Sequence, residues 1–314
     1  MTANSINTTH TMETIGEGVE TVPVTTVGDG TGFSVQTFVC GNVCISPNLA
    51  WGGEHCNIVK GSGFFTSRAN RVWLPVCSFL VETPHGRVLV DTAWNRNMSP
   101  FGVYDRRAQI SSLGSWMLYR INQGVVGPNR TIRERLAAQG VEPRDLDYVV
   151  ISHLDCDHAN GLRMMKDAGK IMIADDEMRG ATEHGIVNRV RFYPGWWNGL
   201  KNVDLYHWNG TEGPAGKSYD LFGDGSVQLI NIPGHTRGLV ATKITNPDGK
   251  YVLLFADGGY SSKSWQDMIV SGIAVDKRAQ KRSLEWIREQ SLDPNCIASM
   301  ASHDPAHVDN IIRF

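Results

Sequence analysis

The chain has 314 residues, of which 41% are hydrophobic and 20% are charged. This composition suits one large folded domain or two small ones, and it excludes intrinsic disorder over most of the chain. The 30 Lys and Arg nearly balance the 32 Asp and Glu, giving a net charge of -2, whereas a nucleic-acid-binding protein is expected to carry a basic excess. No apolar run approaches the ~20 residues that a membrane-spanning helix needs.

The N-terminal residues and the cysteine count predict a compartment. The first residues carry neither the basic nor the apolar segment of a secretory signal. Six Cys in a chain of this size without such a signal indicate reduced thiols, so we expect a cytoplasmic protein.

Strand patterns begin after a polar stretch. Residues 1–32 are predicted to be a mobile arm, because the first 20 or so are Thr-rich and lack periodicity, and residues 33–314 are expected to form one domain. Short β-branched and apolar runs bounded by turn residues predict strands over 34–39, 76–82, 87–91, 148–152, 170–174, 203–206, 227–232, 239–245, 251–256 and 297–302.

Fewer segments predict helices. Thr131 and Glu134 form a capping box at the start of a helix over 132–139, and further helices are predicted over 159–167 and 277–290. Two sets of strands with interspersed helices predict an α/β fold, in which two β-sheets lie face to face with helices on the outer faces.

Four side chains that can bind metal follow one predicted strand. The strand over 148–152 leads directly into His153, Asp155, Asp157 and His158. Residues two apart in extended chain point the same way, so His153 and Asp155 can face one ion, and a turn can bring the other two toward a second point. Groups this crowded are costly to bury unless a cation compensates them. The alternative is a solvated loop in which they occur by chance.

Three later strands are each followed by another such residue. His235 follows an apolar strand in a Gly/Pro turn, Asp257 follows the next strand, and His303 follows the last. A lone His is more often a hydrogen-bonded structural residue. The repeated order of strand and then ligand predicts a binuclear metal site, assembled from loops at one edge of the sandwich.

The residues from about Phe33 to Phe314 resemble the metallo-β-lactamase superfamily, whose signature is His-x-His-x-Asp-His with later His, Asp and His ligands. Within it the chain is most similar to the N-acyl-homoserine lactonase group, in the strand pair over 75–92 and in the approach to the motif over 141–153. Tyr260, three residues after Asp257, lies where those lactonases keep a substrate-holding tyrosine. The resemblance implies an αββα sandwich of two mixed sheets and a single hydrolase domain.

The resemblance also implies a ligand set, with one departure: Asp155 replaces the second His of the signature. The first ion would be held by His153, Asp155 and His235, and the second by Asp157, His158 and His303, with Asp257 bridging both. Zn is the expected metal for the two ions. Mn and Fe are alternatives, because an extra carboxylate makes the site more anionic and harder.

Asp91 resembles the aspartate that orients a ligand His in this family, and a turn or N-cap role is the alternative. A metal-bridging hydroxide would attack a lactone or related carboxylic ester. Tyr260 would donate a hydrogen bond to the oxyanion, and Asp157 would combine ligation with proton transfer. A phosphoester or phosphotriester hydrolase on the same fold is the alternative, followed by a non-hydrolytic diiron or metal-binding protein.

The expected partner is a small-molecule lactone or ester with an apolar acyl group. We expect no nucleic-acid or membrane partner, and a homodimer is the assembly considered.

Two further features stay open. Cys40, Cys44 and Cys56, together with His55, are compatible with a zinc knuckle, although the spacing is unusual. The cluster of Trp94, Trp116, Met117, Trp196 and Trp197 fits either core packing or an apolar substrate wall. The side chain of Cys156 is expected to point away from the ions.

Overall fold

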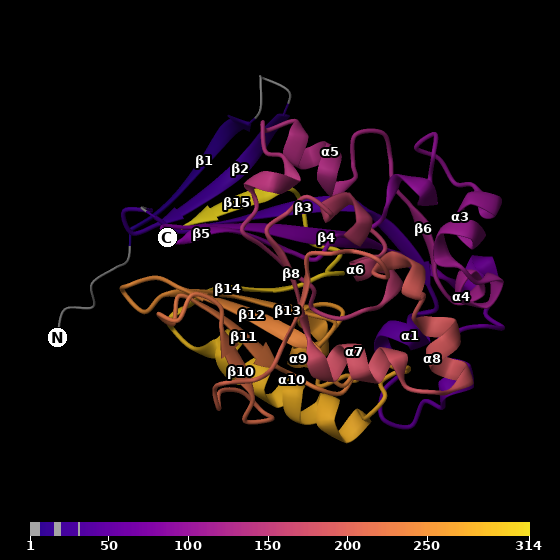
Figure 1. The fold of residues 1–314 in the computed structure, drawn as a ribbon. Helices are drawn as coiled ribbons and strands as arrows, with labels where there is room; N and C mark the ends of the chain where they lie inside the picture. The colour runs from indigo at the N-terminus through magenta and orange to yellow at the C-terminus, as the bar shows by residue number, and fades with distance from the viewer. Residues whose placement is uncertain (1–6, 16–19, 31) are drawn as a thin grey trace.

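The computed structural model describes residues 7–15, 20–30 and 32–314. Within these ranges two β-sheets lie face to face, with α5 (Ile132–Ala137) over the larger sheet and α10 (Lys277–Leu292) over the smaller one (Figure 1). The predicted αββα sandwich is therefore confirmed. Among the same residues, no helix combines the length and the apolar character that crossing a membrane requires.

The larger sheet contains ten strands in the described part of the chain, in the order β1-β2-β15-β3-β4-β5-β7-β8-β9, with β6 beside β3. Strands β5, β7, β8 and β9 run parallel to one another, whereas β3, β4 and β5 are antiparallel, so the sheet is mixed. The strands are β1 (Thr8–Ile15), β2 (Glu20–Val27), β3 (Ser34–Ile45), β4 (Val72–Thr83), β5 (Gly86–Val90), β6 (Gln123–Val125), β7 (Tyr148–Val150), β8 (Lys170–Ala174), β9 (Val203–Tyr206) and β15 (Asn310–Arg313).

The smaller sheet is also mixed, because β13 pairs antiparallel with β12 and parallel with β14. Its described strands follow the chain order, as β10 (Ser218–Asp220), β11 (Val227–Asn231), β12 (Val240–Thr245), β13 (Tyr251–Ala256) and β14 (Cys296–Ala301).

The other α-helices are α1 (Pro47–Trp51), α2 (Ile58–Ser62), α3 (Arg106–Leu113), α4 (Trp116–Ile121), α6 (Cys156–Ala159), α7 (Asp175–Thr182), α8 (Ile186–Arg191) and α9 (Ser262–Gln266). Short 3₁₀ helices are η1 (Arg68–Asn70), η2 (Arg96–Met98), η3 (Pro143–Asp145), η4 (Leu162–Met165) and η5 (Pro194–Trp196). The capping box predicted at Thr131 and Glu134 is present at the start of α5.

Strand β13 shows how alternation builds the two hydrophobic layers. All six of its residues are buried. Val252 and Leu254 pack into the core between the sheets, whereas Leu253 and Phe255 pack into the cluster that contains Leu284 and Ile287 of α10. Successive side chains of a strand point to opposite faces, so a continuous apolar run is what a strand covered on both faces requires.

All ten predicted strands are present, but one predicted helix has different bounds. Instead of a helix over 159–167, α6 ends at Ala159 and η4 follows Gly161. The Gly161 N–H donates to the Ala93 carbonyl instead of continuing the helix. Gly161 also lies so close to the Thr92 carbonyl that a Cβ would be 2.2 Å from its oxygen.

Part of the predicted N-terminal arm forms strands that the sequence did not predict. Residues 1–6, 16–19 and 31 lie outside the described residues. Strand β2 pairs in parallel with β15, and Val22 and Val24 are buried against Ile311. Arg313 of β15 also forms an ion pair with Glu13 of β1. The mobility of the arm and the single domain over 33–314 stay predictions.

Arg71 is a buried residue that joins the ends of two short helices. Its guanidinium donates hydrogen bonds to the carbonyl oxygens of Gly63 at the end of α2 (2.9 Å) and of Arg120 and Ile121 in α4 (2.5 and 2.7 Å). It also approaches the Cys44 carbonyl at 3.5 Å. The last carbonyls of a helix have no partner within the helix, so one planar cation satisfies several of them at once.

Replacing Arg71 with Met should lower the free energy of unfolding by about 2–4 kcal/mol, because buried carbonyl groups lose their charged donor. Urea unfolding measures this loss. Arg68→Met is the control, since Arg68 is exposed three residues away, and it should cost less than ~1 kcal/mol. Equal losses in the two variants would contradict the role of Arg71.

Candidate metal centre

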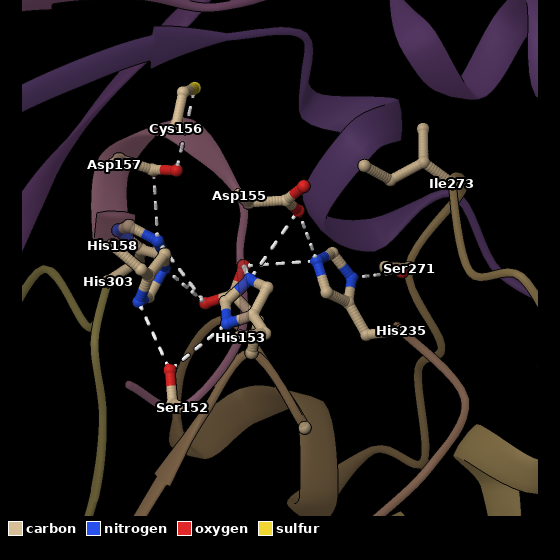
Figure 2. Close-up of polar contacts among 12 residues, drawn as sticks. Ser152, His153, Asp155, Cys156, Asp157, His158, His235, Ser271, Ile273 and His303 are labelled. Carbon is tan, nitrogen blue, oxygen red and sulfur yellow. Dashed lines mark hydrogen bonds and ion pairs between the residues drawn. The ribbon is translucent and has the colours of Figure 1, made fainter. Parts of the chain in front are cut away.

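The seven predicted ligands come together at strand ends from both sheets, and all of them are buried. Figure 2 shows six of them side by side. His153 and Asp155 follow β7, and α6 begins directly after Asp155 and carries Asp157 and His158. The other three follow strands of the smaller sheet: His235 after β11, Asp257 after β13 and His303 after β14.

The turn that carries His235 depends on a glycine. Gly234 has φ +140°, and a Cβ there would lie 2.2 Å from the backbone nitrogen of Gln280 in α10. Only glycine allows so close an approach of the turn to the helix. The packing of α10 therefore fixes where His235 can lie.

The two carboxylate oxygens of Asp257 face two different pairs of histidines. Its Oδ2 lies 3.9 Å from His153 Nε2 and 3.5 Å from His235 Nε2. Its Oδ1 lies 3.5 Å from His158 Nε2 and 3.2 Å from His303 Nε2. These spacings suit donor atoms that share a cation, and a carboxylate between two such groups can bridge two ions.

The remaining carboxylates complete two separate groups. Asp155 Oδ2 lies 2.9 Å from His235 Nε2 and 3.4 Å from His153 Nε2. Asp157 Oδ2 lies 3.3 Å from His303 Nε2. Within the described residues, three overlapping groups of side chains have ligand atoms that all lie within 4.8 Å of one another: His153, Asp155 and His235; His153, His158 and Asp257; and Asp157, His158 and His303.

Several of these atoms have no hydrogen-bond partner in the described part of the chain. They are the Nε2 atoms of His153, His158 and His303 and the Oδ1 atom of Asp257, and all are buried. Leaving buried polar atoms unpaired is costly, so native proteins seldom do it without a reason. Nitrogen and carboxylate donors in this arrangement fit divalent cations.

The far nitrogen of each histidine is anchored. His303 Nδ1 donates to the Pro75 carbonyl at 2.7 Å, and His158 Nδ1 lies 2.7 Å from Asp91 Oδ2. The Nδ1 atoms of His153 and His235 contact the hydroxyls of Ser152 (3.0 Å) and Ser271 (3.3 Å). A carbonyl can only accept, so Nδ1 of His303 carries the proton and its Nε2 keeps the lone pair that a metal needs.

Asp91 holds the start of the motif as well as His158. Its carboxylate accepts hydrogen bonds from the backbone N–H and the hydroxyl of Ser152, at 2.8 and 2.7 Å. Asp91 and Ala93 adopt left-handed backbone with φ of 61° and 49°, which is strained for residues other than glycine. These contacts support the interpretation of Asp91 as a residue that orients a ligand His.

Two residues that the sequence interpretation missed also hold the ligand loops. Glu177 of α7 is buried and accepts hydrogen bonds from the backbone N–H groups of Leu154 (2.9 Å) and Gly238 (3.0 Å), so one carboxylate joins the first motif to the loop after His235. Arg191, at the end of α8, pairs with Asp155 through two hydrogen bonds. No local pattern marks either residue, because each contacts the site only through the tertiary fold.

The electrostatic environment differs between the two halves of the site. Burial raises the pKa of Asp155, but the Arg191 guanidinium outweighs burial and holds this pKa well below its usual range. Burial, together with Arg191, lowers the pKa of His235 to about 4 although Asp155 opposes the shift. In the other half, burial lowers the pKa of His158, but Asp91 and Asp257 raise it well above its usual value. The carboxylates of Asp91 and Asp257 therefore favour positive charge in that half.

Tyr260 lies against both halves of the centre. Its ring is buried and stacks on His303, with centroids 5.3 Å apart and an interplanar angle of 21°, and it meets His235 edge-on at 5.8 Å. Burial and the nearby carboxylates of Asp257, Asp157 and Asp155 raise its pKa well above the usual value. Tyr260 therefore keeps its hydroxyl proton at neutral pH and can donate a hydrogen bond.

An apolar cavity of about 290 Å³ reaches the site at Asp155 and Arg191. The other residues that line it are Ile58, Val59, Ser62, Phe64, Phe65, Leu118, Ile121, Asn122, Ile186, Val187, Val190 and Ile273. The five residues considered for an apolar substrate wall, Trp94, Trp116, Met117, Trp196 and Trp197, do not line this cavity. Trp94, Trp196 and Trp197 are buried in the core, as the packing alternative expected.

All six cysteines are unpaired. Cys40, Cys44 and Cys56 belong to none of the ligand groups found among the described residues, so the geometry does not support a zinc knuckle. The side chain of Cys156 points away from the four histidines, as expected (Figure 2). Its sulfur lies 3.2 Å from Asn122 Nδ2.

The fold and the site define a protein with an αββα sandwich and a candidate two-ion centre at its edge. The sequence model of the metallo-beta-lactamase superfamily matches residues 71–253. The chain belongs to the metallo-β-lactamase superfamily.

Similar proteins include N-acyl homoserine lactonase AttM of Rhizobium radiobacter, which is 26% identical over 240 residues, or 74% of this chain and 82% of its own length. Probable metallo-hydrolase Rv2300c of Mycobacterium tuberculosis is 28% identical over 235 residues, covering 72% of this chain and 70% of its own. A structure of an N-acyl homoserine lactone hydrolase with N-hexanoyl-L-homoserine bound at the catalytic metal centre has a TM-score of 0.66 at 20% identity, over 87% of this chain and 94% of that one. At this identity the structural likeness shows the fold.

Replacing Asp91 with Asn should weaken metal binding about 10–100-fold, because the amide cannot accept from both His158 and Ser152 as the carboxylate does. The ion nearest His158 should be affected most. Competition with a chelator of known affinity measures the change. Asp248→Asn, at an exposed turn position, is the control, and an unchanged affinity in Asp91→Asn would contradict the orienting role.

Proposed function

We propose that the chain is a binuclear metal-dependent hydrolase that opens a lactone or a related carboxylic ester. The observation that carries the proposal is the position of Asp257, whose two oxygens face separate pairs of histidines. The curated relatives named as N-acyl homoserine lactonases support a lactone substrate.

The residues that would hold the ions follow from the groups described above. His153, Asp155 and His235 would bind the first ion; Asp157, His158 and His303 would bind the second; and Asp257 would bridge them. Two divalent ions at such a centre supply Lewis acidity and lower the pKa of a water molecule. We propose Zn as the metal, in keeping with a similar structure described as a dizinc lactonase.

The chain's own residues would then position the substrate. The apolar cavity would take the acyl group, since burial of apolar surface provides most of the binding free energy at such pockets. The Tyr260 hydroxyl would donate a hydrogen bond to the carbonyl oxygen as negative charge develops there. Asp157 would carry a proton in addition to ligating the second ion.

An apolar cavity favours an acyl lactone or ester over a phosphate substrate. Arg191 is the only Lys or Arg among the described residues that line it, and its charge is already paired with Asp155. A phosphoester substrate would meet no free cation there. Among the residues that the structure describes, no contact specifically favours a non-hydrolytic diiron role. A cytoplasmic location and a homodimer stay predictions from the sequence.

Metal analysis combined with a substrate series tests the proposed function. The purified protein should hold close to two ions per chain and should hydrolyse acylated lactones. The value of kcat/KM should rise about fourfold for each added methylene until the cavity is filled, because each buried CH₂ contributes ~0.8 kcal/mol. A metal content near zero that added Zn, Mn or Fe does not restore would contradict the proposal, as would faster turnover of phosphotriesters than of lactones.

Replacing Tyr260 with Phe should lower kcat about tenfold while both ions stay bound. The loss of one donor costs about 10²–10³ at an oxyanion hole without metal, and the ions share this task here. Tyr251→Phe is the matched control, because the hydroxyl of Tyr251 in β13 donates a hydrogen bond to the carbonyl of Gln290 in α10. Unchanged kinetics in Tyr260→Phe would assign Tyr260 to packing.

A further inference from the structure

We propose that Arg191 is a positioning residue for the first ion. It neutralises Asp155 and directs one carboxylate oxygen toward His153 and His235, so that the Asp155–Arg191 pair takes the place of the imidazole at this position of the signature. This inference rests on the proposed function, because it assumes that the centre binds two divalent ions.

The pair has a geometry that leaves one oxygen available to a metal. Arg191 Nε donates to Asp155 Oδ1 at 2.5 Å, and Arg191 Nη2 donates to Asp155 Oδ2 at 2.7 Å. Oδ2 is also the oxygen that lies 2.9 Å from His235 Nε2. A carboxylate oxygen has two lone-pair positions, so Oδ2 can accept from Arg191 and still face a cation between the histidines.

Other contacts hold the guanidinium in this orientation. Arg191 Nη2 lies 3.3 Å from the His235 carbonyl oxygen, and Nη1 lies 3.5 Å from the Ile273 carbonyl oxygen. The guanidinium also lies over the ring of Phe192, 5.3 Å from its centroid. The Arg191 side chain is only 11% exposed. A planar donor fixed on several sides can orient the carboxylate before any ion binds.

The charge of this half of the site is set by both residues together. A neutral imidazole at position 155 would add no charge, whereas a carboxylate alone would add one negative charge. Arg191 Nη2 also lies 3.0 Å from His235 Nε2, which brings its positive charge close to the first group, and an ion bound to His235 Nε2 would replace this contact. The pair is therefore neutral, and the expectation that Asp155 makes the site more anionic does not hold once Arg191 is counted. The oxygen donor itself remains.

This charge balance predicts how substitutions at the two positions depend on each other. Asp155→His alone would leave Arg191 as a buried cation without its carboxylate, beside the position of a dication. Replacing Arg191 with Met at the same time removes that cation and produces the imidazole signature with a neutral neighbour. The single variant should therefore bind the first ion worse than the double variant does.

Metal affinity and stoichiometry in the full chain test the proposal, with Zn, and with Mn in parallel, as probes. Wild type should bind two ions, and Asp155→His should hold about one, with the affinity for the other reduced at least ~100-fold. Asp155→His combined with Arg191→Met should regain the second equivalent, to within about tenfold of the wild-type affinity. The single variant Arg191→Met completes the double-mutant cycle. The change in metal affinity of the double variant should differ by tenfold or more from the product of the changes in the two single variants.

Three results would overturn the proposal: two tightly bound ions in Asp155→His, no recovery in the double variant, or additive single effects. Thermal unfolding of the chelator-treated variants distinguishes a positioning role from a purely structural one. A purely structural pair would shift the unfolding midpoints of the variants without changing their metal affinity. If Asp155→His does not fold, Asp155→Asn takes its place in the cycle, and only the additivity of the single effects is then tested. Because no substrate is used, a metal-free wild type would contradict the proposed function, whereas a two-ion wild type without coupling would contradict only this inference.

Discussion

The constraint on which the rest of the structure depends is the cost of burying charge. Three carboxylates and four imidazoles lie within a few ångströms of one another, all shielded from water. In a low-dielectric interior such a group of like-charged carboxylates is unfavourable unless cations balance it. The surrounding fold satisfies this constraint by supplying an anchor for every ligand histidine. The opposite nitrogens of His153, His158 and His303 have no partner among the described residues, whereas that of His235 contacts Asp155 and Arg191. The unpartnered atoms converge on the positions that cations would occupy.

The sandwich architecture makes that convergence achievable. Strands β7, β11, β13 and β14 belong to two sheets, yet each leads into a ligand-bearing loop at the same edge. The strands are rigid because their side chains pack on both faces, and the loops need only be short to reach the site. Buried polar residues then link the loops to one another: Asp91 joins β5 to the first motif, and Glu177 joins that motif to the loop after β11. These hydrogen bonds fix the positions of the ligand loops relative to one another.

Asp155 illustrates how a substitution is understood only with its neighbour. Taken alone, a carboxylate in place of an imidazole changes the charge of the site and its preference among metals. Together with Arg191 it forms a neutral pair with one oxygen still directed at the histidines. The same pair lines the apolar cavity, so the residues that would set the charge around the first ion also border the space proposed for the substrate.

The sequence by itself determined ten of the strands, the ligand types and their order, because each of these is local. A β-branched run between turn residues and a His or Asp directly after it can be recognised within ten residues, and the capping box of α5 is equally local. Only the tertiary structure decided the partners. Arg191 meets Asp155 across 36 positions, Glu177 meets Gly238 across 61, and Arg313 meets Glu13 across 300. The strands of the N-terminal segment were missed for the same reason, since β2 owes its burial to β15 at the far end of the chain. Such contacts depend on how the sheets bring distant segments together, and no short-range pattern encodes them.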